Sequence, residues 1–288
     1  MKSNRIILAL LILVISSGIL TAQKKQAKPY FFIQITDPQF GMFESNKGFQ
    51  KETELYEKAV KEINRLKPDF VVITGDLVNN SKDPLQIKEF KRITSNIDTK
   101  IPVYFTPGNH DIGNAPDSTS IAAYVNNYGY DRFSFKHKRS LFLGINSSII
   151  KNDFPQLEQK QYDWLVKTLS KGKKASHIIL FCHYPFFINS SDEPEGYSNI
   201  GVENRKKYLV LFATNKLDAI FSGHLHNNAI SKFGKIEMVT TSAVGKPLGN
   251  VPSGLRIVKV YHDRIDHVYY GLDEIPGSIT FDQNIQTK

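Results

Sequence analysis

The chain has 288 residues, of which 41% are apolar, and its 37 lysine and arginine residues outnumber its 28 acidic residues, which gives a net charge of +9. The apolar fraction is too high for a disordered chain, and the single cysteine excludes an internal disulfide and a cysteine-rich zinc or iron–sulfur site. The excess of positive charge favours an anionic partner without indicating which kind.

The first segment, residues 1–22, has the pattern of a secretory signal peptide. Lys2 and Arg5 make a basic start, residues 6–15 are an unbroken apolar run, and Ala22 is a small residue suited to cleavage. The alternative is an uncleaved membrane anchor, but the apolar stretch is shorter than the roughly 20 residues that a spanning helix needs. We therefore expect an exported protein, periplasmic or secreted, without stable membrane insertion after cleavage.

The rest of the chain alternates between strand and helix patterns after a polar lead-in at residues 23–29. Apolar, β-branched runs predict strands over residues 30–36, 70–74, 103–106, 133–135, 141–145, 178–182, 219–221, 229–233, 236–240, 255–261 and 265–270. Helical spacing of apolar residues predicts helices over residues 52–67, 84–97, 157–169 and 203–214. This order predicts an α/β layered fold with a mixed sheet or two facing sheets, in one domain over residues 30–288.

Several of these predicted strands end in polar side chains that are able to bind a metal ion. They are Asp37 with Gln39, Asp76, Asn109 with His110 and Asp111, His183, and His224 with His226. A single histidine or Gly-Asp pair after a strand is commonly structural. In α/β sheets, however, ligand sites gather at the carboxyl ends of strands, so the repetition indicates a functional site.

The same segments resemble the ordered blocks of the calcineurin-like metallophosphoesterases, and most closely the calcineurin-like phosphoesterase domain-containing subgroup. The blocks are Asp37-Pro-Gln39, Gly75-Asp76-Leu-Val-Asn79-Asn80, Gly108-Asn109-His110-Asp111, His183 and Gly223-His224-Leu-His226. The resemblance implies a four-layer αββα sandwich of two mixed β-sheets flanked by helices, with two divalent metal ions.

By this resemblance, Asp76 bridges the two metal ions. The remaining ligands would be Asp37, Gln39 and His226 for one ion, and Asn109, His183 and His224 for the other. Oxygen and imidazole donors without a thiolate suit Mn, Fe or Zn. Two divalent ions carry more charge than two carboxylates and a bridging hydroxide offset, so the centre would attract a phosphate group.

Gln39 departs from the broad family, in which most members have histidine at this position. Its neutral carbonyl oxygen is a harder and weaker donor than imidazole. Three interpretations follow: Gln39 ligates directly, it ligates through water, or one metal site is weak or empty. Direct ligation is the interpretation that we carry forward, and it favours Mn or Fe over Zn.

His110 suits a catalytic role beside the metal ions, because a histidine can protonate the leaving oxygen of an ester. We expect Asp111 to bond to its other ring nitrogen and so fix the tautomer; the alternative is that Asp111 caps the following helical segment. Attack by a metal-bridging hydroxide requires no side-chain nucleophile, so Cys182 is predicted to be a core residue.

The predicted function is hydrolysis of phosphate monoesters, with a small-molecule phosphate ester as substrate. Alternatives that use the same site are a phosphodiesterase or nucleotide pyrophosphatase, and a serine/threonine phosphoprotein phosphatase. We expect no nucleic-acid partner, because the sequence shows no basic stripe or aromatic platform. Residues 184–204, 112–120 and 242–253 are expected to wall the site, with Phe186, Phe187 and Tyr197 either stacking on a substrate or packing within their own loop.

Overall fold

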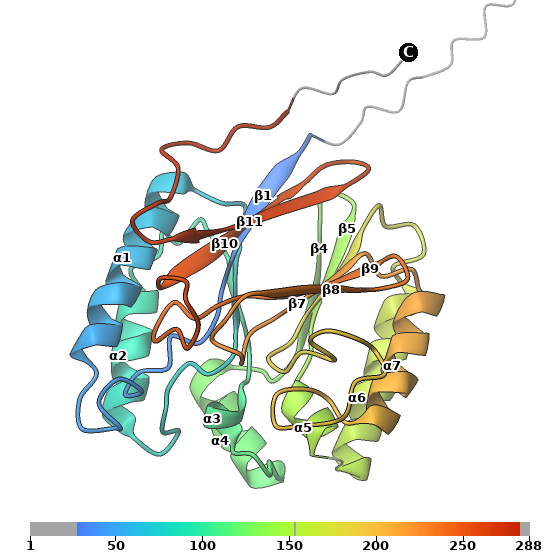
Figure 1. Ribbon diagram of the computed structural model, residues 1–288, viewed down its shortest axis with the longest axis horizontal. Helices are drawn as coiled ribbons and strands as arrows, with labels where there is room; N and C mark the ends of the chain where they lie inside the picture. Colours follow the sequence, from blue (N-terminus) through green and yellow to red (C-terminus); the bar gives the residue numbers. More distant parts are fainter. Residues whose placement is uncertain (1–27, 153, 283–288) are drawn as a thin grey trace, which may run out of the picture.

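The structure, a computed structural model, describes residues 28–152 and 154–282, so the predicted signal peptide lies outside the described residues. Two β-sheets pack face to face between two layers of helices, with α1 and α2 on one side and α6 and α7 on the other (Figure 1). This arrangement confirms the predicted four-layer α/β sandwich of two mixed sheets.

The first sheet has five strands in the order β11-β10-β1-β2-β3. Its strands are β1 (Tyr30–Ile35), β2 (Val71–Thr74), β3 (Val103–Thr106), β10 (Gly254–Val260) and β11 (Ile265–Gly271). β1, β2 and β3 run parallel, while β10 is antiparallel to both β1 and β11. The crossover helices α1 (Gln50–Leu66) and α2 (Pro84–Thr94) pack on its outer face. The carboxyl ends of β1, β2 and β3 therefore meet at one edge.

The second sheet has six strands in the order β4-β5-β6-β7-β9-β8. Its strands are β4 (Phe133–His137), β5 (Ser140–Gly144), β6 (Ile178–Phe181), β7 (Ala219–Ser222), β8 (Ala229–Phe233) and β9 (Ile236–Thr240). The four central strands are parallel, and β4 and β8 pair antiparallel at the edges. Helices α6 (Pro155–Ser170) and α7 (Val202–Thr214) cover the outer face.

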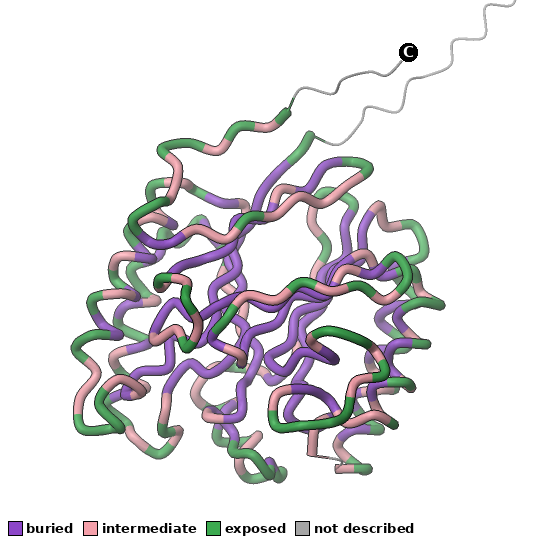
Figure 2. The backbone as a smooth tube through the Cα atoms, in the orientation of Figure 1, coloured by how far each residue is buried: buried purple, intermediate pink, exposed green. Residues whose placement is uncertain are grey.

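The apolar core is divided into three clusters that correspond to the interfaces between the four layers. The cluster between the sheets is rich in phenylalanine, and Phe32 stacks on Phe70 while meeting Phe142 and Phe181 edge to face. Such edge-to-face pairs are favoured by the aromatic quadrupole. Cys182 is fully buried in the cluster under α6 and α7, as predicted for a core residue. Figure 2 shows the buried segments concentrated in the two sheets and the exposed ones at the periphery.

Three short helices were not predicted from periodicity: α3 (Asn109–Ile112), α4 (Ser118–Tyr128) and α5 (Ser147–Lys151). α4 nevertheless has a short apolar stripe, in which the buried Tyr124 lies between the partly buried Ile121 and Tyr128. Its start is marked by Asp117, whose side chain accepts the backbone N–H of Ser120.

No helix within residues 28–152 and 154–282 is long and apolar enough to cross a membrane.

Candidate metal centre

The predicted metal ligands converge where the carboxyl ends of strands from both sheets meet. Two groups of side chains have ligand atoms within 4.8 Å of one another: Asp76 with His183 and His224, and Asp37 with Asp76 and His226. Asp76 belongs to both groups. All five side chains are buried, and buried carboxylates and imidazoles at this spacing are a suitable donor set for two cations that share one bridging carboxylate.

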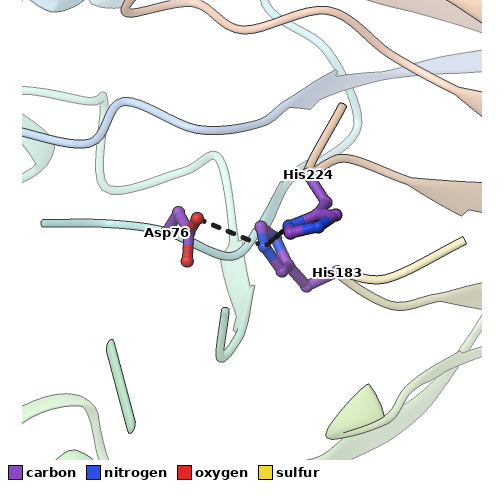
Figure 3. Close-up of side chains that lie close together, drawn as sticks. All are labelled: Asp76, His183 and His224. Atoms are coloured by element: carbon purple, nitrogen blue, oxygen red, sulfur yellow. Dashed lines mark hydrogen bonds and ion pairs between the residues drawn. The ribbon is translucent and has the colours of Figure 1, made fainter. Parts of the chain in front are cut away.

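The first group is centred on Nε2 of His183 (Figure 3). This nitrogen lies 3.3 Å from Asp76 Oδ2, 3.2 Å from His224 Nδ1 and 3.0 Å from Asn109 Oδ1. The other ring nitrogen, Nδ1, donates to the carbonyl oxygen of Thr74 at 2.9 Å. That bond leaves the lone pair on Nε2, so His183 faces its neighbours with the atom that can bind a metal.

The second group contains oxygen atoms that have no hydrogen-bond donor among the described residues. Asp37 Oδ1 and Gln39 Oε1 are both buried and unpartnered, and His226 Nε2 lies 3.4 Å from that Asp37 oxygen. Leaving a buried polar atom unpaired costs about 1–3 kcal/mol, so such atoms call for a partner. A cation fits both oxygens, which supports direct ligation by Gln39.

Hydrogen bonds from neighbouring segments fix the orientation of these donors. Gln39 Nε2 donates to Asn79 Oδ1 at 3.1 Å, which assigns the amide so that its oxygen faces the centre. His226 Nδ1 donates to the carbonyl oxygen of Lys246 at 2.6 Å, so its lone pair is on Nε2. Lys246 lies in the segment 242–253, which therefore borders the site as expected.

The backbone at the site is strained in a way that the sequence did not reveal. Left-handed φ angles occur at Asp37 (51°), Gln39 (37°), Asp76 (48°), His224 (71°) and His226 (50°). For residues other than glycine such backbone conformations cost about 1–3 kcal/mol each and cluster at functional sites. These backbone conformations turn the chain directly after each strand, which brings the ligand side chains to a common point.

Glycines precede several of these ligands because the backbones approach too closely for a side chain. A Cβ atom on Gly108 would lie 2.1 Å from Asp76 Oδ1, and one on Gly223 would lie 2.6 Å from Asp37 Oδ2. Both distances are far below van der Waals contact. The glycines of the Gly-Asn and Gly-His blocks thus have a steric role in assembling the centre.

The electrostatics favour the metal-binding protonation states of Asp76 and His224, but they favour a protonated ring at His183 and His226. Burial raises the pKa of the Asp76 carboxyl, but the adjacent His183 more than offsets this, and the resulting pKa is below its usual range. Burial and the nearby His183 lower the pKa of His224 to about 3. Asp76 is therefore ionised and His224 neutral at neutral pH, as metal binding requires. Burial lowers the pKa of His183, but the Asp76 carboxylate more than offsets this and raises it to about 9, so a cation that binds at Nε2 must displace a proton.

The structure places His110 at the edge of the centre. Its backbone N–H donates to Asp76 Oδ1 at 2.8 Å, and its half-buried ring bonds through Nδ1 to the carbonyl oxygen of Asn79 at 2.9 Å. The orienting partner of the ring is therefore this carbonyl group, and the expectation that Asp111 fills that role is wrong.

Asp111 instead ties together the two segments that carry Asp76 and Asn109. It accepts hydrogen bonds from the backbone N–H groups of Leu77 (2.9 Å), Val78 (3.3 Å) and Gly108 (2.8 Å). The last of these is a capping interaction at the start of α3, the helix that contains Asp111, whereas the cap of the following helix α4 is Asp117. Asp111 is thus a positioning residue rather than a catalytic one.

The aromatic residues after β6 were expected either to stack on a substrate or to pack within their own loop, and the structure separates them. Phe186 and Phe187 are buried in the core cluster next to α7, so they pack within the protein. Tyr197 is exposed and its hydroxyl contacts Asn109 at the metal centre. Only Tyr197 is placed where it can meet a substrate.

Two facing mixed sheets with ligand groups that share Asp76 define the class of dinuclear metallohydrolases. The family model "Calcineurin-like phosphoesterase" matches residues 32–228, and the chain belongs to this family. The chain is thus a metal-dependent phosphoric ester hydrolase.

Individual relatives agree with this assignment. The human "Serine/threonine-protein phosphatase CPPED1" is 38% identical over 267 residues, which cover 86% of this chain and 85% of the relative. Two solved structures share the fold at 14% identity: a dimetal phosphatase from Danio rerio (TM-score 0.62, covering 86% of this chain and 98% of that one) and a purple acid phosphatase from yellow lupin (TM-score 0.64, covering 86% and 52%).

Proposed function

We propose that the protein hydrolyses phosphate monoesters at a centre of two divalent ions. The observation that carries this proposal is that Asp76 lies in both ligand groups, between Asp37 with His226 on one side and His183 with His224 on the other. When bound, a pair of divalent ions holds the phosphoryl oxygens and lowers the pKa of coordinated water, which supplies the nucleophile at neutral pH.

His110 is proposed to assist the leaving group. A carbonyl oxygen only accepts, so His110 Nδ1 carries a proton and donates a hydrogen bond to the carbonyl oxygen of Asn79. Nε2 is then the ring nitrogen that exchanges a proton with the departing ester oxygen. The backbone bond from His110 to Asp76 holds the ring beside the centre during this exchange.

We propose Mn or Fe as the bound metals. The second group combines Asp37 with the amide oxygen of Gln39, and the first includes the amide oxygen of Asn109 next to His183. Neutral oxygen donors suit harder ions better than they suit Zn, which more often takes nitrogen and sulfur ligands. Metal analysis of the purified protein after growth with each metal in equal supply tests this assignment.

A second candidate substrate is a phosphoserine or phosphothreonine protein. It is favoured by the printed name of the human relative, a serine/threonine-protein phosphatase. The signal-peptide pattern of residues 1–22 favours an environmental small-molecule ester instead, because export separates the enzyme from cytosolic phosphoproteins.

A substrate panel separates these activities. We would compare p-nitrophenyl phosphate, its bis-ester and a phosphoserine peptide with the Mn-loaded protein, and use Asp76→Asn as the control for a contaminating phosphatase. Preferential turnover of the monoester supports the proposal. Faster turnover of the bis-ester supports the phosphodiesterase alternative, and faster turnover of the peptide supports the phosphoprotein alternative.

Export is also a proposal, since residues 1–22 lie outside the described residues. Expression of the full chain in a bacterial host, followed by mass measurement of the protein recovered outside the cytoplasm, tests it. A chain that begins after Ala22 supports cleavage, whereas a full-length chain in the membrane fraction contradicts it.

A further inference from the structure

Tyr197 lies in the segment between β6 and α7 and reaches over the metal centre. Its hydroxyl oxygen accepts a hydrogen bond from Asn109 Nδ2 at 3.3 Å, and its ring centroid lies 5.0 Å from that of His224. Despite these contacts, Tyr197 remains 62% exposed. One side of the residue therefore faces two candidate metal ligands, and the rest is open to solvent, where a substrate would enter.

The segment that carries Tyr197 is anchored by the buried side chain of Arg205. Its guanidinium donates to the carbonyl oxygens of Ser191, Glu193 and Ile200 at 2.6–3.2 Å. The carboxylate of Glu193 in turn accepts three backbone N–H groups of the same segment. A segment whose backbone is already fixed loses little backbone entropy when one of its side chains contacts a ligand.

The hydrogen-bonding capacity of Tyr197 is only half used. The Asn109 amide nitrogen can only donate, so the Tyr197 oxygen is the acceptor in this contact and its phenolic proton is left for another partner. Within the described part of the chain, that proton has no acceptor in hydrogen-bond range. A nonbridging oxygen of a phosphate group held at the centre would be such an acceptor, and it is anionic.

We propose that the Tyr197 hydroxyl donates a hydrogen bond to a phosphoryl oxygen of the bound ester, and that its ring forms a wall against the leaving group. This inference rests on the proposed phosphomonoesterase function and adds a substrate-contacting residue to it. The direction of the Asn109 contact follows from the ligand role of that residue: Oδ1 faces His183 Nε2, so Nδ2 faces the Tyr197 hydroxyl.

The test is the binding of inorganic phosphate to the Mn-loaded protein, measured by calorimetry without turnover. Tyr197→Phe keeps the ring and removes only the hydroxyl. Tyr162→Phe is the matched control, because it removes a hydroxyl from α6, in the outer helix layer, and not from the metal centre. We expect Tyr197→Phe to raise the phosphate dissociation constant about 10- to 100-fold, the range for one hydrogen bond to a charged group. Metal content, measured on the same samples, should equal that of the wild type.

Tyr197→Ala tests the wall. Tyr197→Ala should bind phenyl phosphate more weakly than Tyr197→Phe does. The two variants should have the same affinity for inorganic phosphate. Equal phenyl phosphate affinities would overturn the role of the ring.

Three results would overturn the phosphate contact. They are an unchanged phosphate affinity in Tyr197→Phe, a loss of metal in that variant (which would show that the hydroxyl acts only through Asn109), and a wild-type protein that does not bind phosphate. A wild type that binds phosphate through Tyr197 but hydrolyses no monoester would count against the proposed function alone.

Discussion

His183 Nε2 lies 3.3 Å from Asp76 Oδ2, although the two residues follow strands of different sheets. Asp76 comes after β2 of the first sheet and His183 after β6 of the second. The same holds for Asp37 and His226, which follow β1 and β7 and lie 3.4 Å apart. The metal centre is therefore a contact between the two sheets, and its assembly depends on how they dock.

The first prediction follows from this position between the sheets. Metal bound only by the folded protein stabilises it, by about 2.7 kcal/mol when the free ion is at 100 times its dissociation constant. Mn should therefore raise the midpoint of thermal unfolding. Asp76→Asn should remove most of this increase and lower activity by more than about 100-fold. Mutation of a residue that only hydrogen-bonds to a metal ligand already lowers metal affinity or activity about 10- to 100-fold. An equal response to Mn in the variant and the wild type would contradict the bridging position of Asp76.

The second prediction concerns Gly108. In Gly108→Ala the new Cβ would lie 2.1 Å from Asp76 Oδ1, so the segments that carry Asp76 and Asn109 must move apart. We expect a loss of about 1–3 kcal/mol in the free energy of unfolding, as for other overpacked sites, together with reduced metal content. Gly277→Ala is the matched control, because its Cβ would meet no atom within 4 Å. Denaturant unfolding and metal analysis of both variants decide the question; a harmless Gly108→Ala would disprove the steric role.

The third prediction concerns Gln39, whose buried Oε1 has no donor among the described residues. Gln39→His replaces an oxygen ligand with imidazole and should shift the metal preference from Mn towards Zn. Competition between the two metals, followed by elemental analysis, measures the shift. Gln50→His on the exposed side of α1 makes the same exchange away from the site and should change nothing. If the two variants behave alike, Gln39 is not a ligand.

The fourth prediction is a pH dependence of stability at His177. Its Nε2 donates to the carbonyl oxygen of Tyr261, and Nδ1 lies 3.5 Å from the Asp218 carboxylate. Burial lowers the pKa of His177, but Asp218 more than offsets it, and the net shift is upward. A histidine pKa that is raised on folding stabilises the protein below the unfolded pKa of about 6.5, and this contribution is lost as the pH rises through the folded pKa.

Asp218→Asn should accordingly destabilise the protein more at about pH 5.5 than at about pH 8.5. Urea unfolding of both proteins at the two pH values measures the difference. A destabilisation that is the same at both pH values would show that the carboxylate acts only through its bond to the backbone N–H of Ile178.

Local sequence patterns were sufficient for much of the fold and for the types of residue at the site. The runs at β1, β2 and β6 are apolar and β-branched, and each ends in a polar residue, so both the strands and their functional ends are visible along the chain. The helix α4 was missed although Ile121, Tyr124 and Tyr128 have helical spacing and pack on the core, so this signal was also present in the sequence.

The sequence by itself determined the ordered blocks from Asp37 to His226 and therefore the donors available to a metal ion. Only the tertiary structure decided which donors meet, that Asn79 rather than Asp111 orients His110, and that Tyr197 lies over the centre. The physical reason is that periodicity and turn chemistry act over a few residues. Hydrogen-bond partners across the centre are set by the docking of two sheets, whose contacts join residues far apart in the chain.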